Sequence, residues 1–153
     1  MKTLIAYFSW SNNTLDLVNE VNKEFNFDIF RIERTIAYSN DYNECAYVEA
    51  KNEVDNNIHP DIKDINFDLN SYDRILLFFP IWWYTFPMCV GSFIEKLNGY
   101  KGKVILFENS YTNDNLYIEN CLKNFRIINK DIDVRNGLFN KSDSEHIKFI
   151  KNI

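Results

Sequence analysis

The chain has 153 residues, of which 46% are apolar and 25% charged, and its formal net charge is -5. This length and balance are typical of one globular domain with a sizeable core, so we expect a single domain over residues 1–153. The negative charge disfavours nucleic acid as a partner, because a phosphate backbone is bound by a basic surface.

The cysteines and the apolar runs bear on location. The 3 cysteines lie far apart without C-x-x-C spacing, and their odd number favours reduced thiols, most simply as small buried apolar residues. The N-terminus enters an apolar segment without the charged and hydrophobic regions of a secretory signal. The most apolar stretch, 75–90, is interrupted by Pro80 and Pro87 and falls short of a membrane span. We expect a cytoplasmic protein that does not enter a membrane.

Strand and helix patterns alternate along the first part of the chain. Residues 5–8 form an apolar run typical of a strand, and residues 15–25 carry apolar side chains at helical spacing. A second and more polar strand is predicted over 27–33, near an edge of the sheet. Helical composition returns from 42 to about 56, with small apolar residues on one stripe, and His59-Pro60 ends it.

The second part of the chain continues the alternation. Residues 74–79 are continuously apolar and are bounded by Pro80, which is typical of a strand buried on both faces. Further helices are predicted over 90–97, 116–125 and 143–150, and further strands over 103–107 and 133–139.

Five strands that alternate with helices predict an α/β fold, a doubly wound parallel sheet with helices on both faces. In such folds a ligand binds beyond the carboxyl ends of the strands, where the strand order reverses. Three segments leave the carboxyl end of a predicted strand, and these are 9–14, 80–87 and 108–115. The functional site is therefore expected among these loops.

The first of these loops has the composition of a phosphate site. It places Ser9, Ser11 and Thr14 directly before a predicted helix, where unpaired backbone N–H groups and the helix dipole favour an anion. The three hydroxyls could point into the same small space. The alternative is an ordinary Asn or Thr cap on a strand-to-helix turn.

The second loop has the composition of a stacking platform. Trp82, Trp83 and Tyr84 stand together between Pro80 and Pro87. A flat heterocycle stacked on one such ring would gain roughly 1 to 3 kcal/mol. Adjacent side chains cannot both face one ligand, so one of the two tryptophans is expected to pack into the core. Tyr84 could equally be a lid or interface residue.

The loops carry no cation. No Lys or Arg occurs between Lys2 and Lys23, between Arg74 and Lys96, or between Lys103 and Lys123. A phosphate would therefore be bound by amides and hydroxyls, and no Arg is evident for the additional phosphate of NADPH. Three acidic residues near the third loop predict a neutral or negative mouth, and these are Glu108, Asp114 and Glu119.

Taken together, Tyr7-Phe8-Ser9-x-Ser11-x-Asn13-Thr14 and Pro80-x-Trp82-Trp83 resemble the flavodoxins, in particular short flavodoxin-like proteins with a Pro-x-Trp-Trp second loop. Residues 37–43 and His59-Pro60 are similar to the same subgroup, and the resemblance spans about residues 2–140. It implies a five-stranded flavodoxin-like sheet of order 2-1-3-4-5 that binds FMN non-covalently.

The resemblance also implies the cofactor-binding residues. The FMN phosphate would be bound by the first loop, comprising Ser9, Trp10, Ser11, Asn12, Asn13 and Thr14. The isoalloxazine would lie between Pro80, Ile81, Trp82, Trp83 and Tyr84 on one side and Asn109, Ser110 and Tyr111 on the other.

The chain departs from the family pattern in each loop. Asn12 replaces a glycine of the first loop, and asparagine is the residue other than glycine that best tolerates a positive φ. Tyr84 replaces a glycine at which a backbone flip lets a carbonyl accept a hydrogen bond from reduced flavin, so we expect altered semiquinone stability. Asn109-Ser110-Tyr111-Thr112 replaces a Thr-Ser-Gly-Gly run in the third loop.

Three functions fit these residues. The first is a low-potential electron carrier that binds FMN and redox partner proteins, because an acidic site without cations disfavours negative charge on reduced flavin. The second is an FMN-dependent reductase that takes hydride from NAD(P)H and reduces a quinone or a similar acceptor. The third is a binding module that has lost FMN. No catalytic side chain or metal site is expected, since His59 and His146 lie outside the loops.

Overall fold

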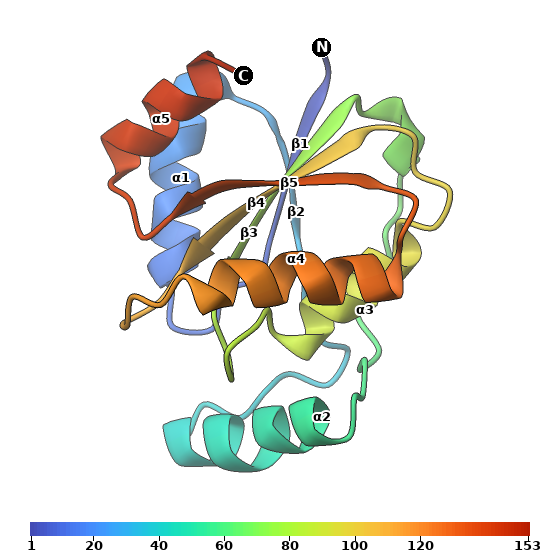
Figure 1. Cartoon of the computed structure of the whole chain (residues 1–153), viewed down its shortest axis with the longest axis vertical. Helices are drawn as coiled ribbons and strands as arrows, with labels where there is room; N and C mark the ends of the chain where they lie inside the picture. The colour runs from blue at the N-terminus through green and yellow to red at the C-terminus, as the bar shows by residue number, and fades with distance from the viewer.

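A single parallel sheet organises the structure, a computed structural model that describes residues 1–153. Its five strands lie in the order β2-β1-β3-β4-β5, which confirms the predicted α/β class and strand order (Figure 1). The strands are β1 (Thr3–Tyr7), β2 (Asp28–Arg31), β3 (Arg74–Pro80), β4 (Lys103–Asn109) and β5 (Asp133–Phe139), and the helices are α1 (Asn13–Phe25), α2 (Lys51–Asp55), α3 (Met88–Lys96), α4 (Leu116–Ile128) and α5 (Asp143–Lys151).

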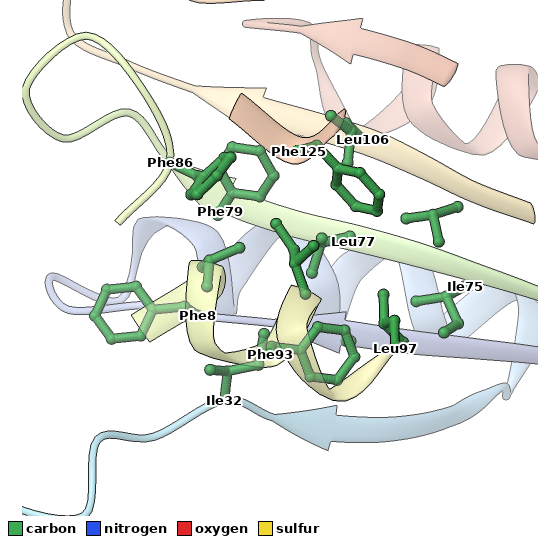
Figure 2. Close-up of a cluster of buried hydrophobic side chains, with 14 of the residues drawn as sticks. Phe8, Ile32, Ile75, Leu77, Phe79, Phe86, Phe93, Leu97, Leu106 and Phe125 are labelled. Carbon is green, nitrogen blue, oxygen red and sulfur yellow. The ribbon is translucent and has the colours of Figure 1, made fainter. Parts of the chain in front are cut away.

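Two hydrophobic clusters lie on opposite faces of the sheet. Successive strand residues point to opposite faces, so Leu77 and Phe79 join one cluster while Leu76 and Phe78 join the other. Helices α3 and α4 cover the first face, and α1 and α5 cover the second (Figure 1). Figure 2 shows side chains of β3 meeting those of α3 and α4 in the first cluster.

Parallel register brings three loops to one edge. Tyr7 of β1 pairs with Phe78 of β3, and Pro80 at the end of β3 pairs with Asn109 of β4. The loops after β1, β3 and β4 therefore leave the sheet side by side. β2 is an edge strand, as predicted, and is shorter than the predicted span 27–33.

The crossover between β2 and β3 departs from the usual arrangement. Residues 44–50 form a π-helix, η1 (Glu44–Ala50), that runs directly into α2. The sequence predicted one helix here, and its position was expected to be on the sheet. Instead this helix stands apart from both helical layers (Figure 1). None of the helices is long and apolar enough to span a bilayer.

Candidate cofactor-binding site

One cavity of about 740 Å³ opens beyond the carboxyl ends of β1, β3 and β4. All three predicted loops line it, and no charged side chain is part of its wall. Every predicted site residue except Asn12 lies in this wall: Ser9, Trp10, Ser11, Asn13, Thr14, Pro80, Ile81, Trp82, Trp83, Tyr84, Asn109, Ser110 and Tyr111.

Asn12 acts through its backbone. Its φ is 70°, the left-handed conformation expected where the family has glycine, and its side chain makes no cap hydrogen bond. No group of the chain accepts a hydrogen bond from the N–H of Ser11, Asn13 or Thr14. These donors remain available at the start of α1, as an anion site requires. The predicted alternative, an Asn or Thr cap, is not what the structure has.

The hydroxyls of the first loop differ in their partners. Ser9 Oγ, although three residues before the N-cap position Asn12, accepts a hydrogen bond from the Leu15 N–H in the first turn of α1 at 3.2 Å. Thr14 Oγ1 donates to Asn109 Oδ1 at 2.8 Å, which joins the first and third loops. Only Ser11 has a hydroxyl without a partner in the chain, so the expectation of three equivalent hydroxyls is too simple.

A cation lies behind the first loop. Arg31, at the end of β2, donates a guanidinium hydrogen bond to the Ser9 carbonyl at 3.3 Å. Its side chain is not part of the cavity wall. No sequence signal marks it, because it comes from the neighbouring strand and not from one of the three loops.

The second loop is a tight turn with two strained residues. The backbones of Trp82 and Thr85 exchange hydrogen bonds of 2.8 and 3.4 Å. Between them, Trp83 and Tyr84 have φ values of 52° and 70°. Positive φ at both central residues is characteristic of a type I′ turn, which usually carries Asn and Gly. Tyr84 therefore adopts a conformation that suits the family's glycine.

The two tryptophans have different surroundings. Trp82 packs edge to face against Phe8 and Tyr38, with ring centroids 5.1 and 5.2 Å apart. Trp83 donates its indole N–H to the Ala46 carbonyl at 2.8 Å. Both are half-buried and both line the cavity, so the prediction that one of the pair packs into the core holds only in part: Trp82 packs against the core and also reaches the cavity.

Asn140, after β5, fixes the glycine-free third loop. Its Oδ1 accepts from the Ser110 N–H at 2.7 Å, and its Nδ2 donates to the Thr112 carbonyl at 3.3 Å. Its own φ is 52°. The loop thus keeps one shape through side-chain hydrogen bonds, with Asn109, Ser110 and Tyr111 lining the cavity.

Glu108 does not belong to the mouth of the site, contrary to the sequence prediction. It lies inside β4, is 1% exposed, and is not part of the cavity wall. Burial raises its pKa to about 8. The Asn136 amide nitrogen, in its satisfied orientation, lies 2.5 and 3.1 Å from the two carboxyl oxygens. Asp114 and Glu119 are exposed, but neither is part of the cavity wall.

Several wall residues were not predicted as site residues. Thr112 belongs to the third loop and Tyr117 to the first turn of α4, and the others come from the crossover helix: Tyr42, Cys45, Ala46, Tyr47 and Ala50. The helix was predicted, but a stripe of small residues gives no signal that distinguishes contact with a sheet from contact with a cavity. All three cysteines are buried, as expected.

The sequence model of the flavodoxin family matches residues 2–153, so the chain belongs to this family. The flavoprotein from Lactobacillus acidophilus NCFM, solved in complex with FMN, is similar with a TM-score of 0.79 and 24% identity, covering 97% of this chain and 98% of that one. A candidate flavoprotein from Bacteroides uniformis ATCC 8492 gives 0.77 and 26%, covering 98% and 97%.

A more distant structure, the WrbA-like flavodoxin from Agrobacterium tumefaciens, has a TM-score of 0.62 at 10% identity and covers 98% of this chain and 93% of that one. No curated protein matches the chain. The similarity in fold and the family membership confirm the resemblance to the flavodoxins, and family membership supports FMN as the cofactor.

Proposed function

We propose that the protein binds FMN non-covalently in this cavity and serves as a low-potential electron carrier between redox partner proteins. One observation carries the proposal above the others. The first turn of α1 presents free N–H groups to a cavity whose wall has no charged side chain and includes the indole of Trp83. The free N–H groups suit an anionic group, and the indole suits a flat ring.

Each loop has one task in this proposal. The N–H groups of Ser11, Asn13 and Thr14 would bind the phosphate, assisted by the free Ser11 hydroxyl. Trp83 and Tyr84 would border one side of the isoalloxazine, and Asn109, Ser110 and Tyr111 the other. When bound, FMN supplies the redox chemistry, while the protein sets its potential through charge and hydrogen bonds.

We expect the charges around the cavity to decide whether the reduction potential of bound FMN is raised or lowered. No cation lines the wall and the chain is negative overall, while Arg31 bonds the first loop from behind and Lys51, paired with Asp55 at 2.7 Å, lies 5.2 Å from the centroid of the Trp83 ring. Such an environment disfavours negative charge on reduced flavin, so a low potential is expected. The three buried cysteines favour a reducing compartment, and we infer a cytoplasmic location.

Loading and a paired variant test the binding site. The purified protein is expected to be yellow, or to become yellow with added FMN. Ser11→Ala with Thr14→Ala should weaken FMN affinity, measured by titrating the apoprotein, while Thr35→Ala on an exposed loop should leave it unchanged. A colourless protein that refuses FMN supports the FMN-free binding module, and an unchanged affinity contradicts the phosphate assignment.

Kinetics distinguish a carrier from an enzyme. Photoreduced protein loaded with FMN should pass single electrons to an acceptor such as cytochrome c, without consuming NAD(P)H. Steady NAD(P)H turnover by the pure protein would instead establish the reductase.

A further inference from the structure

The position of the crossover helix is unusual for its fold. A helix between two parallel strands normally covers a face of the sheet and buries its apolar stripe there. Here η1 and α2 stand beyond the strand ends and leave Tyr47 and Val48 57% and 54% exposed (Figure 1). The placement sacrifices hydrophobic burial, so it calls for another role.

Buried polar contacts fix this helix in its place. Arg34 pairs with Glu49 at 2.6 Å and with Glu53 at 3.2 Å, and Tyr38 donates to Glu53 at 2.5 Å. Glu53 is only 4% exposed. A carboxylate buried this deeply holds one position, because losing a partner would leave its charge uncompensated.

Two indoles attach the same segment to the cavity. Trp10 of the first loop donates its N–H to the Ser39 carbonyl at 2.9 Å, and Trp83 of the second loop donates to the Ala46 carbonyl at 2.8 Å. The segment therefore closes one side of the cavity at a defined distance. Its part η1 is a π-helix. Such helices are rare in proteins, and those that occur are often found at functional sites.

The face turned to the cavity has the shape of a slot. Ala46 and Ala50 are one turn apart and small, so they form a low floor, and Tyr42 and Tyr47 stand beside them. Ring centroids of Tyr42 lie 6.2 Å from Trp10 and 6.1 Å from Tyr47, and Tyr47 lies 5.6 Å from Trp83. We name Tyr42, Ala46, Tyr47 and Ala50 the tyrosine slot.

We propose that the tyrosine slot binds a second planar ring, uncharged and bearing carbonyl oxygens, beside the FMN. The inference rests on the proposed function, because it assigns the phosphate and the isoalloxazine to the three strand-end loops and leaves this wall unassigned. An uncharged ring fits a wall without charged side chains, and aromatic walls favour a flat ligand.

The free polar groups of the slot specify the carbonyl oxygens. The indole N–H groups of Trp10 and Trp83 are already donated to the backbone, whereas the hydroxyls of Tyr42 and Tyr47 have no partner in the chain. Two phenolic donors at the edge of a flat slot suit ring carbonyls. Cys45 also reaches the cavity, but burial raises its pKa to about 12, so its thiol is no nucleophile and binding is non-covalent.

Menadione is a suitable probe, with its sulfonated analogue as the charged comparison. Titrated into the FMN-loaded protein, menadione should perturb the flavin absorbance, and the sulfonate should bind more weakly. Tyr47→Ala should weaken menadione binding about ten-fold, the loss of one aromatic contact. Tyr42→Phe with Tyr47→Phe keeps both rings and should weaken it about five-fold. Val48→Ala, on the same helix outside the cavity wall, should change nothing.

The FMN affinity of each variant separates the alternatives. All of these variants should bind FMN as the parent does. Menadione that leaves the spectrum and the binding heat of the loaded protein unchanged overturns the proposal, as does a Tyr47→Ala variant that loses FMN affinity and keeps menadione. If the protein refuses FMN altogether, the proposed function fails by itself, and calorimetric titration of the apoprotein with menadione still decides the slot.

Discussion

The Thr14 hydroxyl donates to Asn109 Oδ1 over 2.8 Å, although the two residues are 95 positions apart in the chain. Thr14 is 1% exposed, so little of it is open to solvent when the bond is lost. Thr14→Val keeps the shape and removes the donor. We expect a loss of about 1 to 2 kcal/mol in the free energy of unfolding, measured in urea, together with weaker FMN binding. Thr35→Val should show neither effect, and equal stability of the Thr14 variant would contradict the role of this bond.

The strained turn makes a prediction about Tyr84. At its φ of 70° a β-carbon is unfavourable, and glycine is free of that cost. Tyr84→Gly should therefore be more stable than Tyr84→Ala by about 1 kcal/mol. Tyr111, which is 91% exposed and has no positive φ, should show the opposite order, with Ala above Gly. The same order at both positions in thermal unfolding would argue against strain.

Glu108 predicts a stability that falls as the pH rises. Its carboxyl ionises near pH 4.5 when unfolded, but burial raises its pKa to about 8 in the folded protein. The folded state binds the extra proton between these values, so stability declines from about pH 4.5 to 8. Glu108→Gln stays neutral and should remove this decline. The shift alone would give a gain on the order of 3 kcal/mol at pH 7, and the Asn136 amide, which favours the carboxylate, makes the expected gain smaller than that.

The matching measurement is the free energy of unfolding of both proteins across that pH range. Glu119→Gln, on the exposed side of α4, serves as the control, and its free energy of unfolding should change with pH as that of the parent does. Parallel curves for Glu108→Gln would mean that Glu108 is ionised within the core.

His146 acts in the opposite direction. It is 1% exposed beside Phe78 and Phe107, its Nδ1 bonds the Ser142 carbonyl at 2.8 Å, and its Nε2 has no partner in the chain. Burial lowers its pKa, so the unfolded chain takes up a proton first as the pH falls below about 6.5. This contribution is complete above that pH and is lost below it. His146→Leu should therefore lose less stability than the parent between pH 7 and 5.

Tyr38 should control whether the crossover helix stays in place. Its hydroxyl is a partner of the buried Glu53 carboxylate, together with Arg34. Tyr38→Phe is expected to cost about 1 to 3 kcal/mol and to increase protease cleavage within residues 39–56. Tyr47→Phe, whose hydroxyl has no partner in the chain, should leave both unchanged. If residues 39–56 of the Tyr38→Phe variant resist the protease as the parent does, the Tyr38 hydroxyl does not hold the crossover helix in place.

The sheet could be predicted because its signals are local. The apolar runs of β1, β3 and β4 are buried on both faces, and alternation with helical stripes leaves one simple topology. The loops followed from that topology, since parallel strands end at one edge.

The remainder depended on contacts between distant residues. Ala46 and Ala50 would show the same stripe whether they contacted the sheet or the cavity. The position of the helix is fixed instead by the contacts of Glu53 with Arg34 and Tyr38. Glu108 resembled a loop residue because a carboxylate inside a central strand is rare. Nothing near Asn140 in the sequence indicates that its side chain shapes a loop some 30 positions earlier.

The chain has 3 tryptophans, Trp10, Trp82 and Trp83, and all of them line the one cavity. Its ultraviolet emission therefore comes almost entirely from the walls of that space. A flavin bound there would accept excitation energy from every indole at short range. Binding would therefore quench the tryptophan fluorescence of the empty protein. The intrinsic tryptophan fluorescence therefore reports whether the cavity is occupied, without any added label.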